Sequence, residues 1–416
     1  MPSGKPIHME LQKTEAEFLG KTRKVSTLKK NIRVLSLTSV VGGAYWGMIR
    51  ATWQPFTLSL GVSMSLLGLF EGLGGRNGLI TALVQPVSGR LSDKMGRKPF
   101  IVLGSILTLT TLAFYTLACY TRDWRFLVPA TISLGLTALS HPASSALTAE
   151  SVEVRERGMA YSVTMFSFIL PGVLTSAFGG WVADLFGYEI LFLISIVLEG
   201  LSLSMLAFLL KETLNQRNEE KDMGRVSLKA ILVPPSELRG FYVSMAADAF
   251  SWGLGAAILF GLLSKTYNFS NLQLGILSSL TFLMWTAFQL PIGKLIEKYG
   301  CKRFLILSEM IGIAMMIGWL TFTSFEVFAL AALLYGLVAS TWVPASQTLL
   351  SNSVEKEERA EAIGRLFAFR GIIGFPAPYV GGLLYEAMGF KAPILAGAIG
   401  VIVTLILIAL FVREPE

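Results

Sequence analysis

Long stretches without charged side chains are the feature that most restricts the fold of this chain. Six of them hold no Asp, Glu, Lys or Arg, namely Pro99–Thr121, Phe126–Ala149, Gly158–Ala183, Thr266–Gly293, Val327–Val354 and Ala392–Val412. Each reaches the ~20 residues that a helix needs to cross ~30 Å of hydrocarbon. Six further apolar windows carry one or a few charges, at about 34–60, 66–90, 187–210, 240–264, 303–323 and 361–386.

These windows predict helices rather than strands. A bilayer offers no water to exposed amides, so a spanning segment must be helical unless it joins a closed barrel. The windows are too long and too evenly apolar for barrel strands. The chain is therefore predicted to be an all-α membrane protein with twelve transmembrane helices.

The distribution of basic residues predicts the orientation. Charged residues make up 15% of the chain, against ~25% in soluble domains, and the net charge is +7. Lys and Arg flank the spans without forming a continuous face, so we expect no nucleic-acid partner. They gather in the N-terminal tail and in every second loop, which places both termini in the cytoplasm of a multi-pass cell (plasma or inner) membrane protein. No cleavable signal peptide is expected before the first span.

The second half of the chain repeats the first about 200 residues later. The segment Gly89–Lys98 (GRLSDKMGRK) recurs as Gly293–Lys302 (GKLIEKYGCK), and Pro142-Ala-Ser recurs as Pro344-Ala-Ser. Six spans in each half make the repeats parallel. The predicted organisation is an N-terminal tail, a first bundle, a cytoplasmic linker and a second bundle, at residues 1–33, 34–210, 211–239 and 240–412.

This arrangement resembles the major facilitator superfamily, whose loop between helices 2 and 3 matches Gly89-x-Leu91-x-Asp93-x-x-Gly96-Arg97-Lys98. The resemblance implies that this loop latches the two halves together on the cytoplasmic side, with Asp93 facing the N-terminus of helix 11. The predicted latch residues are Gly89, Asp93, Gly96, Arg97, Lys98, Gly293 and Glu297. The alternative is a loop that only sets topology.

The proton-antiporter patterns of the family are incomplete here. Helix 4 has Thr131 where those antiporters carry an Arg, and helix 5 has Thr175-Ser176 ahead of Gly179-Gly180 where they carry Gly-Pro. These departures weaken a drug–proton antiport interpretation without removing it.

Ionisable residues inside the spans indicate candidate functional positions, because each costs at least ~2.5–3.5 kcal/mol at the bilayer centre and usually has a partner or faces water. The resemblance implies that helices 1, 4, 7 and 10 line a central cavity. Spacing of four residues puts Trp46, Arg50 and Gln54 on one face of helix 1, and Asp248 and Trp252 on one face of helix 7. With His141 on helix 4, these six residues are the predicted substrate cavity; packing between helices is the alternative for the two tryptophans.

The same charges suggest ion pairs and proton carriers. Arg50, Glu71, Arg76 and Arg370 are ion-pair candidates, with Arg50–Glu71 near the outer side and Arg370–Asp248 within the second half. Asp248 is the first candidate for proton coupling, since a desolvated carboxyl group can exchange protons near neutral pH, and Glu71 and His141 follow. Glu199 and Glu309 are predicted to lie outside the cavity, in packing positions.

The predicted function is secondary active transport by alternating access, with proton-coupled efflux of hydrophobic or amphiphilic small molecules as the first hypothesis. The alternatives are uptake or exchange of a small metabolite, such as a sugar or an organic anion held by Arg50, and, more remotely, a non-transporting membrane sensor. No phosphate-binding loop, catalytic constellation or metal-ligand pattern is recognisable, so neither an enzyme nor a cofactor is predicted. The expected partners are a small-molecule substrate, lipid and protons, and the expected state is a monomer.

Overall fold

The structure is a computed structural model that describes residues 7–75, 78–153, 156–213, 234–354 and 359–414, with the side chains of 7–29 and 359–361 left aside. Within these ranges the chain is helical and contains no strand. The predicted tail and linker fall largely outside the described side chains.

The first half comprises the helices that run from the N-terminus to Leu209. They are α1 (Ile7–Ser59), α2 (Met64–Gly74), α3 (Leu79–Met95), α4 (Arg97–Thr121), η1 (Trp124–Phe126), α5 (Leu127–Leu136), η2 (Thr137–Leu139), α6 (Ser140–Glu150), α7 (Arg157–Ile169) and α8 (Gly172–Leu209).

The second half follows the same order. Its helices are η4 (Ser236–Leu238), α10 (Arg239–Gly255), η5 (Ala256–Ile258), α11 (Leu259–Tyr267), α12 (Asn271–Tyr299), α13 (Cys301–Thr321), α14 (Phe325–Asn352), α15 (Arg359–Gly374), α16 (Ala377–Met388) and α17 (Lys391–Phe411).

These helices account for the twelve predicted spans. Ten stretches of the described chain are long and apolar enough to cross a membrane. One of them, Arg157–Leu209, contains two spans, because Gly187 leaves the helical conformation at φ 83° and turns the chain inside α8. The second helix, α2–α3, is interrupted near Gly75 and completes the set. The prediction of an all-α membrane fold is confirmed.

Several spans are broken where the sequence carries Pro or Gly. Helix 5 breaks at Leu170–Pro171 between α7 and α8, and helix 11 breaks at Phe375–Pro376 between α15 and α16. Proline lacks the amide hydrogen of an intact helical turn. Helix 7 passes through η5 between α10 and α11, which frees backbone groups at the middle of the span.

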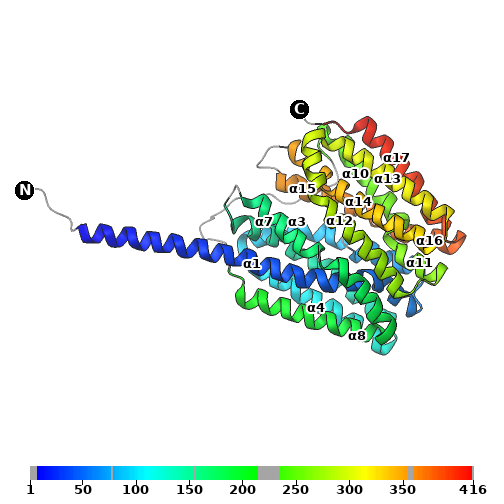
Figure 1. The fold of residues 1–416 in the computed structure, drawn as a ribbon, viewed down its shortest axis with the longest axis horizontal. Coiled ribbons are helices and arrows are strands. Elements are labelled where there is room, and N and C mark those ends of the chain that lie inside the picture. Colours follow the sequence, from blue (N-terminus) through cyan, green and yellow to red (C-terminus); the bar gives the residue numbers. More distant parts are fainter. Residues whose placement is uncertain (1–6, 76–77, 154–155, 214–233, 355–358, 415–416) are drawn as a thin grey trace, which may run out of the picture.

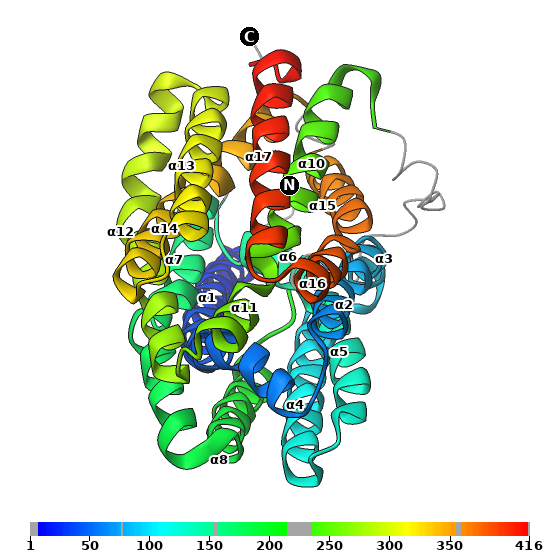
Figure 2. The same cartoon turned by 90° about the vertical axis from the view of Figure 1, so that its right-hand side faces the viewer.

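The two halves face each other along several helix pairs. In Figures 1 and 2 the blue-to-green helices of the first half form the lower body and the yellow-green-to-red helices form the upper body. The contacts between them run from α2 to α16, from α8 to α12, from α3 to α15 and from α1 to α11 and α12.

Glycines show which end of this interface is closed. A Cβ at Gly68 would lie 2.0 Å from the carbonyl oxygen of Pro378, and one at Gly180 would lie 2.1 Å from that of Asn271. Both contacts join the two halves at the end away from the Gly89–Lys98 loop, and such close backbone approach needs a small residue. On the same helix pairs at the other end, a Cβ at Gly293 or Gly364 would meet nothing within 4 Å.

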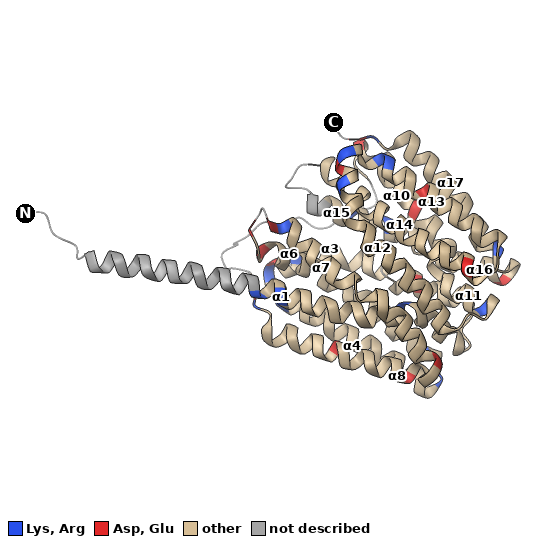
Figure 3. Cartoon of the chain, viewed as in Figure 1, with Lys and Arg blue, Asp and Glu red and all other residues tan. Residues whose placement is uncertain are grey.

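We call the end that carries Gly96 and Gly300 the signature-loop side, and the other the opposite side. Figure 3 shows Lys, Arg, Asp and Glu concentrated near the helix ends, with few charges along the helices. The glycine contacts show that the two halves are closely packed on the opposite side and less closely packed on the signature-loop side.

Candidate functional site

The second half holds a buried ion pair at the level of the helix 7 and helix 11 crossing. Arg370 on α15 donates to Asp248 on α10 at 2.7 Å, and the two side chains are 10% and 5% exposed. The Nε atom of Arg370 also donates to the carbonyl oxygen of Met245 at 3.0 Å. Its guanidinium lies 4.2 Å from the ring centroid of Trp342, a favourable cation–π position. The arginine is thus held from three directions.

A second carboxyl group adjoins this pair. Glu309 on α13 is fully buried, and its Oε2 atom accepts a hydrogen bond from Nε1 of Trp252 at 3.4 Å. Trp252 lies one helical turn beyond Asp248 on α10, and the carboxyl groups of Asp248 and Glu309 are close enough to interact. Glu309 was predicted to lie outside the cavity in a packing position; in the structure it is buried and turned toward Trp252 of helix 7.

Arg50 on α1 is surrounded by aromatic rings. Its guanidinium lies 5.5 Å from the ring of Trp46 and 5.1 Å from that of Phe282, which belongs to α12 in the other half. The Trp46 ring itself packs against Phe168 and Phe282. The Nη1 atom of Arg50 is buried and has no hydrogen-bond partner among the described residues. A buried guanidinium nitrogen without an acceptor can bind an anionic or carbonyl oxygen.

Tyr335 on α14 connects the two charged regions. Its ring packs 5.6 Å from that of Trp252, and the residue lies near Arg50, Glu71 and Asp248. Arg50 and Glu71 also interact electrostatically, but no direct ion pair joins them in the described part of the chain. We call this group the central cluster: Arg50, Glu71, Asp248, Trp252, Glu309, Tyr335 and Arg370.

The remaining predicted cavity residues lie elsewhere. Gln54 is buried, donates to the carbonyl oxygen of Ala257 at 2.7 Å and accepts from the amide of Gly261 at 2.8 Å, so it joins helix 1 to the broken part of helix 7. His141 is exposed and lies 3.1 Å from Gln85. Arg76 lies outside the described residues.

The predicted latch loop is bound within its own half. Asp93 forms an ion pair with Arg97, and Arg97 pairs with Glu150 on α6 at 3.1 Å. The amides of Arg97 and Lys98 donate to Glu212 at 3.0 and 2.9 Å. Within 4 Å, a Cβ at Gly89 would meet only Pro142 and one at Gly293 would meet nothing, and Glu297 is exposed. The start of helix 11, the predicted partner of Asp93, lies partly outside the described residues.

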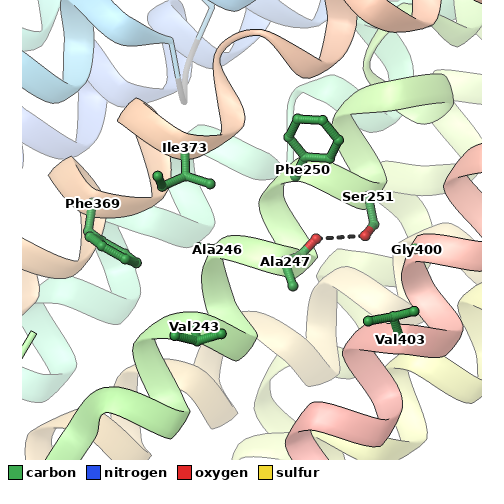
Figure 4. A pocket seen from close by; sticks show the side chains of 9 residues that line it. All are labelled: Val243, Ala246, Ala247, Phe250, Ser251, Phe369, Ile373, Gly400 and Val403. Carbon is green, nitrogen blue, oxygen red and sulfur yellow. Dashed lines mark hydrogen bonds between the residues drawn. The ribbon is translucent and has the colours of Figure 1, made fainter. Parts of the chain in front are cut away.

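An apolar groove of about 470 Å³ lies behind the ion pair. Figure 4 shows its lining side chains from α10, α15 and α17, among them Ala247 and Phe369, the sequence neighbours of Asp248 and Arg370. Val243, Ile373 and Val403 are partly exposed there, so the groove opens on the outer surface of the bundle. The groove offers no charged partner, which leaves recognition of a polar group to the central cluster.

Sequence reasoning missed Tyr335, Phe282 and Trp342, which carry no charge and stand in evenly apolar spans. A tyrosine beside Gly336 in helix 10, a helix that the family places at the cavity, was a usable signal for the first. Nothing in the sequence distinguished the other two from packing aromatics.

Comparison with known proteins gives a consistent result. A sequence model of the Major Facilitator Superfamily matches residues 35–261 and 240–416. The chain is similar to the multi-drug resistance efflux pump PmrA of Streptococcus pneumoniae, with 25% identity over 376 residues, 88% of this chain and 91% of the pump.

Two solved structures share the fold. A variant of the nucleoside transporter NupG superposes with a TM-score of 0.74 and 14% identity, over 92% of this chain and 100% of that chain. The human organic anion transporter MFSD10 (TETRAN) superposes with a TM-score of 0.63 and 19% identity, over 92% of this chain and 99% of that chain.

Proposed function

Because this chain belongs to the Major Facilitator Superfamily, we propose that it is a membrane transporter that exports hydrophobic or amphiphilic small molecules in exchange for protons. The similarity to an efflux pump over most of both chains supports the direction and the substrate class. We further propose that it acts as a monomer in the cell membrane with both termini in the cytoplasm, so that the signature-loop side faces inward.

The observation that carries the proposal is the buried pair of Asp248 and Arg370 at the centre of the second half. Burying two charges costs desolvation free energy even when they pair, and removing one member leaves an uncompensated buried charge. A functional role therefore accounts for a pair at this position. If the carboxyl group is ionised and paired with arginine in one conformation and protonated in the other, protonation shifts the equilibrium between the two conformations of the transport cycle. The aromatic rings of Trp252 and Tyr335 near this pair, and that of Trp46 beside Arg50, suit an amphiphilic substrate.

The direct test uses purified protein in liposomes with an acidic lumen and ethidium, a fluorescent lipophilic cation, outside. The wild-type protein should accumulate the dye as protons leave the lumen. Asp248→Asn should lose this accumulation because the titratable group is removed. Dye binding and dye–dye exchange should persist, because the shape of the site is kept and the neighbouring carboxylate of Glu309 balances Arg370.

A matched control is Glu199→Gln, which removes a buried carboxyl group in the first half, away from the central cluster. This variant should accumulate dye as the wild type does. Normal, pH-dependent accumulation by Asp248→Asn would contradict the assignment of the coupling residue.

One observation favours a second candidate, the exchange of an organic anion. The Nη1 atom of Arg50, which has no hydrogen-bond partner in the described part of the chain, is a ready site for a carboxylate. Under this alternative a labelled aromatic carboxylate would be transported and ethidium would not, and Arg50→Gln would remove anion transport.

A further inference from the structure

The two halves each bury one carboxyl group beside helix 1 or its repeat, helix 7. In the first half it is Glu199 on α8, which accepts a hydrogen bond from Ser105 on α4 and interacts with Tyr45 on α1. Ser105 and Glu309 occupy equivalent positions of the repeat, counted from Lys98 and Lys302. At this position the second half therefore has a carboxyl group, Glu309, where the first half has the hydroxyl group of Ser105, which donates to Glu199.

Glu309 has no comparable hydroxyl partner. Its Oε1 atom receives no hydrogen bond from the described residues, and its Oε2 atom accepts a long one from Trp252. Its other neighbour is the carboxyl group of Asp248, which Arg370 holds at 2.7 Å. Two carboxylates can hydrogen bond only when a proton lies between them, because an ionised carboxylate has no donor.

The charges of the central cluster lead to the same result. Among the described residues, the cluster contains the guanidinium groups of Arg50 and Arg370 and the carboxyl groups of Glu71, Asp248 and Glu309. With both arginines charged, one of the three carboxyl groups is in excess. A buried charge without a counterion is strongly unfavourable, so one proton makes the cluster neutral.

The neighbours of each carboxyl group indicate where that proton resides. Asp248 forms the direct ion pair with Arg370. Glu309 has Asp248 and Trp252 of α10 as neighbours and interacts with Arg370 only at longer range. On α14 Tyr335 interacts with Asp248, Glu71 and Arg50 rather than with Glu309. Of these two neighbouring carboxyl groups, Glu309 is the one without a direct ion pair, so it is the one that holds the proton.

We propose that Asp248 and Glu309 form a carboxyl pair that carries one exchangeable proton, held by Glu309 while Arg370 neutralises Asp248. The exchange is simple: the O–H bond of Glu309 breaks, the proton passes to water, and the pair retains one additional negative charge. A lipophilic cation entering the cluster balances that charge. The second part of the inference, the substrate class, rests on the proposed proton-coupled export; the shared proton does not.

Infrared difference spectroscopy tests the shared proton without any substrate. Purified protein in liposomes is compared between neutral and alkaline pH, and loss of a protonated-carboxyl C=O band is followed. The band assigned to the pair should vanish in Glu309→Gln and in the double variant Asp248→Asn/Glu309→Gln, and should remain in Glu199→Gln. A wild-type difference spectrum unchanged by Glu309→Gln would overturn the proposal, whatever the protein transports.

Binding of ethidium at several pH values tests the link to the substrate. If binding releases one proton, the apparent affinity should rise about tenfold per pH unit over the range in which the pair is protonated. Protons and the dye compete, so affinity rises with pH rather than falls. Glu309→Gln should bind with little pH dependence, and the double variant should likewise show little pH dependence, because the exchangeable proton is absent from both.

The outcomes separate the two ideas. An affinity that falls as pH rises, together with a lost pH dependence in Glu309→Gln, would keep the carboxyl pair and overturn proton–cation exchange. A pH dependence in Glu309→Gln equal to that of the wild type would overturn the pair. Thermal unfolding of each variant, measured alongside, establishes that the compared proteins are folded.

Discussion

At the scale of single residues, Arg370 is the side chain on which the centre of the second half depends. Its guanidinium group pairs with Asp248, donates to the carbonyl oxygen of Met245 and stacks on the ring of Trp342 at the same time. A lysine could not reproduce this arrangement, because only the planar guanidinium stacks on a ring while donating in several directions. Its replacement therefore has consequences for stability as well as for transport.

Arg370→Met should destabilise the protein by ~3–5 kcal/mol, because Asp248 would remain buried without its partner. Adding Asp248→Asn should restore part of the loss, since the uncompensated charge is then gone. Thermal unfolding in detergent measures both effects. Arg50→Met is the comparison: among the described residues no carboxylate pairs directly with Arg50, so its loss should cost less. Equal losses for the two arginine variants would contradict this account of Arg370.

At the scale of elements, the pairs α2–α16 and α8–α12 decide which end of the molecule is closed. Gly68 and Gly382 allow the backbones of helices 2 and 11 to touch on the opposite side, where Gly382 packs against the backbone of Met64 and Ser65. Toward the signature-loop side the same helices diverge, and α3 and α15 pack less closely than α2 and α16 do. The broken helices supply the bends that make this divergence compatible with continuous spans.

Gly68→Ala should disfavour the conformation sealed on the opposite side, because the new Cβ would meet a carbonyl oxygen at 2.0 Å. Overpacking of ~1–3 kcal/mol would change the ratio of the two conformations by about 5- to 150-fold. Spin labels at Tyr120 and Met388, which are 63% and 74% exposed, report the separation of the halves on that side.

The distance between these labels should lengthen in Gly68→Ala. Gly364→Ala is the matched control, since its Cβ would meet nothing within 4 Å. An unchanged distance distribution in Gly68→Ala would show that this contact does not govern closure.

At the scale of the whole molecule, each half is tied together on the signature-loop side by equivalent contacts. Glu212 accepts the amides of Arg97 and Lys98, and Glu414 accepts that of Lys302. The Nζ atoms of Lys98 and Lys302 donate to the carbonyl oxygens of Ala207 and Ala409 at 2.6 and 2.7 Å. Carboxylates at the N-termini of α4 and α13 are favoured by the helix dipole. These bonds stay within each half, which suits two bodies that rock against each other.

The orientation of the whole molecule can be checked with reporter fusions. Fusions after Lys30, Arg217 and Arg413 should report the cytoplasm, and one near Asp123 should report the outside, because basic loops remain inside. A cytoplasmic signal at Asp123 would reverse the assignment of the sealed side and with it the proposed direction of export.

The sequence by itself determined the membrane fold, the twelve spans and the two repeats. These follow from span length, from charge placement and from the second copy of Gly89–Lys98, none of which needs a partner helix to be read. The sequence also identified Arg50, Asp248 and Arg370 as charges too costly to lie in a span without purpose.

Only the tertiary structure decided which of these residues meet. In a bilayer the lipid-facing and the buried faces of a helix are both apolar, so hydrophobic periodicity does not fix the rotation of a span about its axis. That rotation brings Glu309 of helix 9 onto Asp248 and places Tyr335 between the two charged regions. It also turns Gln54 to the backbone of helix 7. The proximity of Asp248 and Glu309 depends on how helices 7, 9 and 11 pack together, and the sequence of each helix alone does not predict it.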